Sequence, residues 1–270
     1  MRIFDAHLHV VDPRFALAPE DAYAPAPFTA ADYRARTASL GISGGAVVAA
    51  SFQGTEQAHL LDALRELGPS FVGVAQLPPR VTDAELLALD AAGMRAMRVN
   101  LVRRTADLDV AARLAARIAD LAGWHVELYV DARDLPDVAP RLGPPERLVV
   151  DHLGLSQAGL PAVVALASRG GGVKASGFGR GDLDVPAALR AIAAANPAAL
   201  MFGTDLPSTR APRPFTDADL DVLLDALGDD LGGRALYDNA AARYRLAAPP
   251  DDDQSARPVS SHDSAAGQGP

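Results

Sequence analysis

Hydrophobic and polar residues alternate along the first ten residues of the chain. Alternation with a period of two predicts a β-strand over residues 2–10, because successive side chains of a strand point to opposite faces. One face of this strand then carries a carboxylate and two imidazoles, from Asp5, His7 and His9, whereas the other face is apolar. Surface strands usually present Thr, Lys or Glu, so we expect the two histidines to converge on a site, with a pair of solvated histidines as the alternative.

After this strand, short apolar runs alternate with longer amphipathic stretches. The apolar runs predict seven more strands, over residues 45–51, 71–76, 94–101, 125–130, 147–152, 172–176 and 199–205. The amphipathic stretches predict helices over residues 30–40, 55–67, 82–93, 109–121, 135–142, 160–168, 185–195, 216–227 and 234–244. Thr55 is expected to cap the second of these helices, and Thr82 with Glu85 forms a capping box before the third.

A strand that is followed by a helix eight times over predicts an α/β fold, a single (β/α)8 TIM barrel over residues 1–246. A doubly wound open sheet is the structural alternative, but no Gly-x-Gly-x-x-Gly turn follows the first strand. Two segments lie outside the pattern. Residues 11–28 form a loop that is long for a compact domain and is placed to close over a site. Residues 247–270 are rich in Pro, Asp, Ser and Gly, which predicts a disordered tail.

The composition excludes several classes of partner and chemistry. The formal net charge of −9 argues against nucleic acid, because phosphate backbones require a basic face. The absence of cysteine excludes disulfides, thiolate metal sites and a cysteine nucleophile. No apolar run reaches the roughly twenty residues of a membrane span, and no leader peptide precedes the first strand. We therefore expect a cytoplasmic monomer or homo-oligomer that binds a small molecule and neither membrane nor nucleic acid.

In a barrel of this kind, active sites lie at the carboxyl ends of the strands, on the inward face. The polar residues that the alternation places there are His7, His9, Ser51, Gln76, Arg98, Asn100, Glu127, Tyr129, His152, Lys174, Ser176 and Asp205. Singly, each has a structural interpretation: His152 as a buried histidine, Asp205 as the cap of the next turn, Lys174 as one half of an ion pair. Three histidines that converge with one aspartate are harder to explain by solvation. His125 begins its strand and is assigned to structure, and His59 lies within a helix and is expected at the surface.

Four motifs in this order resemble the amidohydrolase superfamily (amidohydrolase 2 type), and more narrowly its branch of hydrolases similar to 2-pyrone-4,6-dicarboxylate lactonase. The motifs are Phe4-Asp-Ala-His-Leu-His-Val10, Val150-Asp-His-Leu-Gly154, Val173-Lys-Ala-Ser-Gly-Phe178 with Arg180, and Phe202-Gly-Thr-Asp-Leu-Pro207. The resemblance covers roughly residues 1–245 and is more specific for the superfamily than for a substrate.

The resemblance implies a barrel hydrolase in which Asp205 takes a proton from the attacking water, while His7, His9 and His152 hold the reacting carbonyl or a divalent metal. The candidates for substrate binding are Arg98, Arg104, Arg180, Ser51, Tyr129 and Lys174. Metal-dependent members usually carry a histidine at the end of strand five, where this chain has Tyr129, so the resemblance favours a site with no required cofactor. A zinc or manganese ion held by His7, His9, Asp205 and Glu127 is the alternative.

We therefore expect a hydrolase that opens a lactone, or a similar ester-like bond, of a small carboxylated metabolite. Arginines at the mouth would allow an acidic protein to bind an anionic substrate, because guanidinium groups make local bidentate contacts with carboxylates whatever the total charge. Two alternatives stay open at this point. One is a metal-dependent hydrolase or decarboxylase of the same superfamily, and the other is a barrel that binds an anionic metabolite without turning it over.

Overall fold

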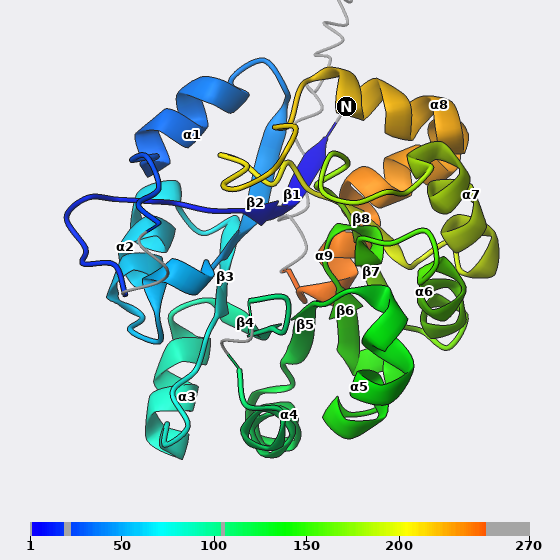
Figure 1. Cartoon of the computed structure of the whole chain (residues 1–270). Coiled ribbons are helices and arrows are strands. Elements are labelled where there is room, and N and C mark those ends of the chain that lie inside the picture. The colour runs from blue at the N-terminus through cyan, green and yellow to red at the C-terminus, as the bar shows by residue number, and fades with distance from the viewer. Residues whose placement is uncertain (1, 19–22, 104–105, 247–270) are drawn as a thin grey trace, which may run out of the picture.

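The computed structural model describes residues 2–18, 23–103 and 106–246 of the chain. Within them, eight parallel strands stand side by side in the order of the sequence, and helices surround them (Figure 1). The strands are β1 (Ile3–Leu8), β2 (Ile42–Val48), β3 (Phe71–Ala75), β4 (Met94–Asn100), β5 (His125–Tyr129), β6 (Leu148–Val150), β7 (Gly172–Ala175) and β8 (Leu200–Phe202). This arrangement confirms the predicted (β/α)8 barrel. The predicted tail, residues 247–270, lies outside the described residues.

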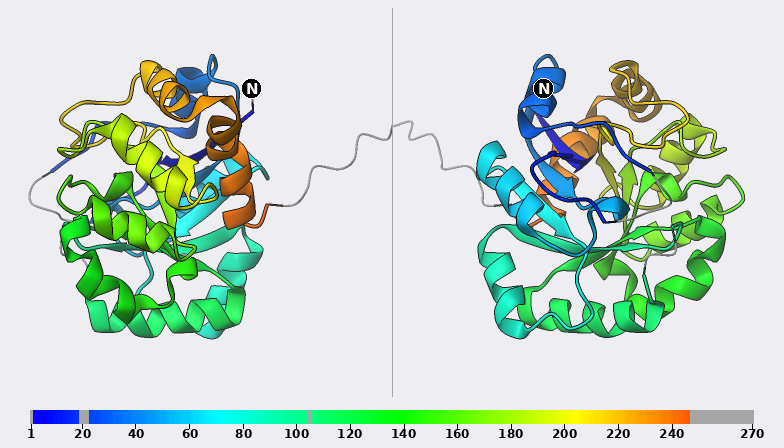
Figure 2. Two further views of the ribbon diagram at one scale, coloured as in Figure 1. Left: turned by 90° about the vertical axis from the view of Figure 1, so that its right-hand side faces the viewer. Right: turned by 60° about the vertical axis from the view of Figure 1, so that its left-hand side comes forward.

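A helix follows each strand and covers the outside of the barrel. The helices are α1 (Ala30–Thr37), α2 (Ala58–Leu67), α3 (Asp83–Ala91), α4 (Leu108–Ala122), α5 (Leu135–Leu142), α6 (Leu160–Ala167), α7 (Val185–Ala195), α8 (Ala218–Gly233) and, after a π-helical segment, α9 (Asn239–Arg243). Figure 2 shows this ring from two further sides. Between α1 and the start of α8, Arg36 pairs with Asp217 at 2.7 Å. The seam between β8 and β1 is joined by backbone hydrogen bonds, since Asp205 N–H donates to His7 O at 2.7 Å and His9 N–H to Leu206 O at 2.8 Å.

The helix ends follow local chemistry, with one correction. The predicted capping box of α3 is present, because Thr82 accepts from Glu85 N–H while the Glu85 side chain bonds back to Thr82. The predicted cap of α2 is wrong: the helix begins at Ala58, and Gln57 rather than Thr55 stands at its N-cap. Helix α8 was predicted to end at residue 227. The helical conformation is interrupted there by Gly228, with a φ of 72°, and then resumes as far as Gly233.

The inside of the barrel is divided by height. Its lower part is apolar and is made of alternate residues of the strands, among them Phe4, Val74 and Met201. Tyr244, directly after α9, closes this end, with its ring 5.5 Å from that of Phe4. Above this layer the inward positions become polar, so the packed apolar floor supports a polar upper half in which the candidate site lies.

Candidate active site

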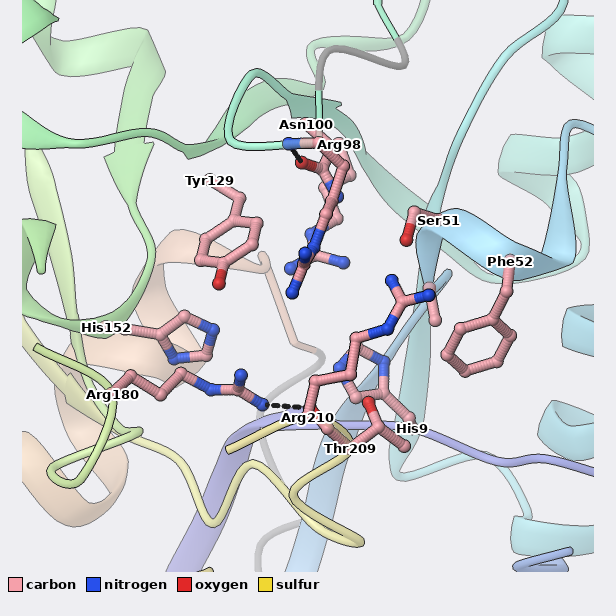
Figure 3. A pocket seen from close by; sticks show the side chains of 12 residues that line it. His9, Ser51, Phe52, Arg98, Asn100, Tyr129, His152, Arg180, Thr209 and Arg210 are labelled. Atoms are coloured by element: carbon pink, nitrogen blue, oxygen red, sulfur yellow. Dashed lines mark hydrogen bonds between the residues drawn. The ribbon is translucent and has the colours of Figure 1, made fainter. Parts of the chain in front are cut away.

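A pocket opens at the carboxyl ends of the strands. Its lining includes His9, Ser51, Tyr129 and His152, all of which the alternation of the strands placed there. Figure 3 shows the side chains of Arg98, Arg180 and Arg210 reaching toward the same cavity from different elements. The mouth of the barrel therefore combines imidazoles with several guanidinium groups.

Three imidazoles surround one carboxylate oxygen at the base of this pocket. The Nε2 atoms of His7 and His9 lie 3.9 Å from Asp205 Oδ1, and Nε2 of His152 lies 4.0 Å from it. Both Asp205 Oδ1 and His7 Nε2 are buried without a hydrogen-bond partner. Buried polar atoms are normally paired, and separations near 4 Å leave room for one atom hydrogen-bonded to both sides. The geometry thus favours a water molecule or a reacting oxygen between them.

Unusual backbone conformations bring the carboxylate and one imidazole to this point. Asp205 has a φ of 59° and His152 a φ of 52°, in the left-handed region that non-glycine residues seldom occupy. Strain of this kind concentrates at functional sites. Gly203 permits the close approach of β8 to β1, because a Cβ at this position would lie 2.8 Å from the backbone nitrogen of His7. Residues on either side of the seam are therefore held tightly against each other.

The three imidazoles are neutral at pH 7. Burial lowers the pKa of His7 below its ordinary value, and burial lowers the pKa values of His9 and His152 well below theirs. His9 Nδ1 lies 2.7 Å from Val48 O, which can only accept, so the proton of His9 sits on Nδ1 and its Nε2 presents a lone pair to the site. His152 Nδ1 lies 3.0 Å from Ser176 Oγ.

A second polar layer lies directly beneath the histidines. Lys174 is fully buried and is bonded to Glu127, and its Nζ lies 3.2 Å from His7 Nδ1 and 3.5 Å from Asp151 Oδ1. Glu127 in turn accepts a hydrogen bond from Tyr244 OH at 2.6 Å. Lys174 was expected to contact the substrate, but it is not among the residues that line the pocket. Its ammonium group lies below the reacting groups instead.

Asp151 belongs to this layer and was missing from the predicted site. Its Oδ2 accepts from Arg98 Nε at 3.1 Å, and its Oδ1 lies 3.3 Å from His7 Nδ1. Burial acts to raise the pKa of Asp151. The positive charges of Lys174 and Arg98 and the contact with His7 have the larger, opposite effect, so this pKa lies well below its ordinary value. The signal was present in the alternation, because Val149 packs in the barrel interior and Asp151, two residues later, has the inward position.

The arginines at the mouth differ in how they are held. Arg180 donates from Nε to Asp205 Oδ2 at 2.6 Å and from Nη2 to Thr209 O at 3.0 Å. Arg98 lies below, bound to Asp151. Arg103 and Arg210 also line the pocket and were not among the predicted substrate contacts. Arg104, which was predicted to contact the substrate, lies outside the described residues.

Three groups of acidic and imidazole side chains among the described residues have the spacing to hold a metal ion. Two are buried and share His7: one adds His9 and Asp205, and the other adds Asp151 and His152. The third, on the surface, consists of Asp12, Asp62 and Glu66, and the guanidinium of Arg14 contacts all three of its members. Glu127, considered above as a fourth metal ligand, is in none of these groups and is bonded to Lys174 and Tyr244 instead.

The two remaining histidines of the described residues lie away from the pocket. His125 is buried at the opposite end of its strand from the mouth, with Nε2 3.1 Å from Glu127 Oε1, as its assignment to structure predicted. His59 was expected at the surface, and this prediction is wrong: the side chain is buried on the inner side of α2, and burial lowers its pKa to about 4.

Comparison with known proteins gives a consistent result. A family model described as amidohydrolase matches residues 4–246. A 2-pyrone-4,6-dicarboxylate hydrolase of Comamonas testosteroni is 38% identical over 156 residues, which are 56% of this chain and 51% of that protein. The chain thus spans about half the length of this curated relative in the matched region.

Solved structures with the same fold include two described by related names. A putative 2-pyrone-4,6-dicarboxylic acid hydrolase of Pseudomonas putida is 28% identical with a TM-score of 0.78, covering 92% of this chain and 98% of that one. A probable 2-pyrone-4,6-dicarboxylic acid hydrolase of Acinetobacter baumannii is 22% identical with a TM-score of 0.77, covering 91% and 100%. Among the helices in the described part of the chain, none is long and apolar enough to span a bilayer.

Proposed function

The chain belongs to the amidohydrolase family, as its four motifs predicted, and from this premise we propose that it is a hydrolase that opens a lactone of a small, carboxylated metabolite. The observation that carries the proposal is the buried, unpartnered Oδ1 of Asp205 with three imidazole Nε2 atoms within 4.0 Å of it. An oxygen in this position is suited to accept a proton from a water molecule. The names of the relatives support the same class of substrate.

Asp205 is the general base of the proposed reaction. Arg180 holds Oδ2 at 2.6 Å, so Oδ1 faces the cavity. A water between Oδ1 and His9 Nε2 finds an acceptor on each side, because the lone pair of His9 is exposed by the bond from its Nδ1 to Val48. The protein therefore orients this water before any substrate arrives, which is how a positioned base contributes to the rate.

In the reaction, the water oxygen forms a bond to the lactone carbonyl carbon while its proton passes to Asp205 Oδ1. The negative charge that develops on the carbonyl oxygen is stabilised by the imidazole and guanidinium donors around it, an effect worth a few kcal/mol per donor, roughly. The ring C–O bond then breaks, and the departing oxygen takes the proton back from Asp205. The carboxylic acid that forms releases its proton to solvent, so the product carries one carboxylate more than the substrate.

The charge around the cavity favours an anionic substrate. Four guanidinium groups, those of Arg98, Arg103, Arg180 and Arg210, line the pocket. Arg98 and Arg180 are paired with buried carboxylates, those of Asp151 and Asp205. The carboxylates of an anionic substrate can accept bidentate hydrogen bonds from planar guanidinium groups. Ser51 and Tyr129 line the same cavity and add hydroxyl groups to its wall.

The residues around His7 fit a resident divalent metal poorly. His7, His9 and Asp205 offer three ligand atoms close together, the minimum for a catalytic zinc. However, a metal-bound histidine normally donates from its other ring nitrogen to a carboxylate or carbonyl, and at that nitrogen of His7 the ammonium of Lys174, 3.2 Å away, competes with Asp151 Oδ1, 3.3 Å away. A guanidinium also occupies the second oxygen of Asp205. Water activation in this proposal is therefore assigned to Asp205 alone.

The decisive experiment is an assay of the purified full chain on a panel of lactones, with 2-pyrone-4,6-dicarboxylate and its monocarboxylate analogues included. We expect turnover that is greatest for the dicarboxylate, and Asp205→Asn should reduce kcat by about a thousandfold or more because the proton acceptor is lost. The folded state of this variant is checked by circular dichroism. Near-normal turnover by Asp205→Asn would exclude the proposed mechanism.

The same preparation separates the two other functions considered above. Elemental analysis of protein purified without chelator, followed by removal of any metal and renewed assay, identifies a metal-dependent enzyme if stoichiometric zinc or manganese is needed for turnover. Binding of the lactones without any turnover would identify a barrel that binds anionic metabolites only.

A further inference from the structure

The Nδ1 atom of His7 has two close neighbours of opposite character. Lys174 Nζ lies 3.2 Å from it, and Asp151 Oδ1 lies 3.3 Å from it. A ring nitrogen of a neutral imidazole either carries a proton and donates or carries a lone pair and accepts. If Nδ1 donates to Asp151, then Nε2 has a lone pair; if Nδ1 accepts from Lys174, then Nε2 carries the proton. The neighbour that forms the hydrogen bond with Nδ1 therefore determines whether His7 Nε2 faces the cavity as a donor or as an acceptor.

The surroundings of Lys174 favour the second arrangement. An ammonium group has three hydrogens to donate, and three acceptors stand around Nζ: Glu127 Oε2, His7 Nδ1 and Asp151 Oδ1. The lysine and both carboxylates are fully buried, so no bulk water can substitute for a lost partner. If Nδ1 of His7 carried a proton, this N–H would face an N–H of the Lys174 ammonium across 3.2 Å. One buried hydrogen of the ammonium would then have no acceptor, which is costly.

We propose that Lys174 is a positioning residue that keeps the proton of His7 on Nε2, so that His7 acts as a hydrogen-bond donor toward the reacting oxygen atoms and is unable to ligate a metal. The step from this tautomer to catalysis rests on the proposed lactone hydrolysis, whereas the tautomer itself does not. Lys174 touches no substrate in this scheme. It acts through His7, from the layer beneath the pocket.

This assignment accounts for the arrangement of acceptors around the cavity. Asp205 Oδ1 and His9 Nε2 both accept, and they lie 3.9 Å apart with no donor between them. A donating Nε2–H of His7, 3.9 Å from the same Oδ1, completes a set of two acceptors and one donor. Such a set matches a single water, which donates twice and accepts once. The match also explains why two unpartnered buried atoms can face each other at the base of the pocket.

The tautomer can be observed directly in the wild-type protein. The chain contains six histidines, so the ring-nitrogen resonances of a uniformly ¹⁵N-labelled sample are few, and His7 is assigned by its loss in a His7→Gln variant. We expect the two-bond nitrogen–proton correlation pattern of a neutral imidazole with the proton on Nε2. A pattern with the proton on Nδ1 would overturn the proposal. This readout requires no substrate, so it stands even if the lactone assay fails.

A paired variant tests the role of Lys174. Lys174→Met alone would strand Glu127 in the barrel, and we therefore combine it with Glu127→Gln, which removes the charge of both partners. In the double variant, Asp151 becomes the acceptor of the Nδ1 proton. We expect the His7 pattern to change to protonated Nδ1, kcat to fall by about tenfold to a hundredfold with KM little changed, and Zn²⁺ affinity to rise by about tenfold or more.

The matched control is Tyr244→Phe, which removes the hydroxyl that donates to the far oxygen of Glu127 and leaves the contact of Lys174 with His7 in place. We expect this variant to lose stability while its His7 tautomer and its Zn²⁺ affinity stay those of the wild type. An unchanged His7 pattern in the double variant would overturn the proposal, and so would the same change of pattern in Tyr244→Phe, since a general loosening of the layer would then be the cause.

Discussion

Asp5 and Asp205 are two carboxylates of the same seam between β1 and β8, and both are almost completely buried, yet their surroundings differ. Asp5 faces outward, toward α1, and its oxygens accept four hydrogen bonds: from His7 N–H, from Tyr33 OH, and from both the backbone and the hydroxyl of Thr204. Asp205 faces inward. One of its oxygens is held by Arg180, and the other has no partner.

The difference separates a structural carboxylate from a chemical one. A buried carboxylate oxygen whose hydrogen-bond donors are all supplied by the protein has no lone pair available for a ligand. An unpaired buried oxygen carries a desolvation penalty, which a hydrogen bond from a water or a substrate removes. Burial alone does not distinguish the two residues, because both are at most 1% exposed. Their hydrogen-bond partners do, and each of the following variants changes one side of this comparison.

The largest expected effect on stability comes from Asp5→Asn. The new amide presents N–H groups to donors that had faced an oxygen, so at least one buried donor loses its acceptor, and we expect a loss of about 3 kcal/mol of unfolding free energy. Turnover should be largely kept, which is the reverse of what Asp205→Asn does. Urea denaturation and the lactone assay on both variants measure the contrast. Equal loss of activity in the two would remove the distinction.

The pH dependence of this effect has a definite sign. Burial raises the pKa of Asp5 to about 6 from 3.8, so folding favours its protonated form. The resulting stabilisation is fully present below the unfolded pKa and is lost as the pH rises through 6, and it amounts to up to about 3 kcal/mol. The wild type should therefore exceed Asp5→Asn by more at pH 4 than at pH 7. The buried histidines change the stability of both proteins with pH in the opposite direction, and this contribution cancels when the two unfolding free energies are subtracted. A difference that stayed constant between pH 4 and pH 7 would contradict the raised pKa of Asp5.

Asp5 also shows where sequence reasoning stops. The barrel and its polar strand ends could be predicted because the period of the pattern matches the period of a strand. Strict alternation placed Asp5 on the same face as His7 and His9, and this is wrong. The pairing of β1 with β2 shifts register between Asp5 and Leu8, so Phe4 and Ala6 point into the barrel while Asp5 points to α1. A bulge of this kind changes the face of every later residue and leaves no clear mark in the sequence.

The end of β6 shows the same limit. Both Asp151 and His152 reach the interior, although neighbouring residues of a strand face opposite sides. The strand ends at Val150, and the left-handed φ of His152 turns its ring inward. Arg210, on the segment after β8, lines the pocket through a loop conformation that no periodicity describes. His152 was nonetheless predicted, whereas Asp151 was missed although alternation along β6 gives it an inward position, and Arg210 could not be predicted from any periodicity.

On the other side of the comparison, Arg180→Gln tests the single partner of Asp205. Without the guanidinium on Oδ2, the carboxylate is free to rotate and its Oδ1 no longer faces the cavity in a fixed direction. We expect kcat to fall by about a hundredfold, the usual cost of misplacing a catalytic group by about 1 Å, and Arg180→Lys to restore part of the loss.

The matched control is Arg213→Gln, which removes a more exposed guanidinium that pairs with Asp219 at 3.0 Å. It should leave kcat within about twofold of the wild type, as expected for a surface ion pair. A similar fall in both variants would mean that loss of positive charge, rather than loss of the bond to Asp205, slows the reaction.

The smallest expected effect is that of Tyr33→Phe, which removes one of the four donors to Asp5 and changes nothing in the pocket. One hydrogen bond to a buried carboxylate is worth about 1–3 kcal/mol, and three donors remain, so we expect a loss of about 1 kcal/mol with unchanged kcat. If this loss arises through Asp5, it should vanish when Tyr33→Phe is made in the Asp5→Asn background, because the two changes remove the same interaction. Additive losses would mean that the Tyr33 hydroxyl stabilises α1 by another route, and that the carboxylate is less completely held than its four partners indicate.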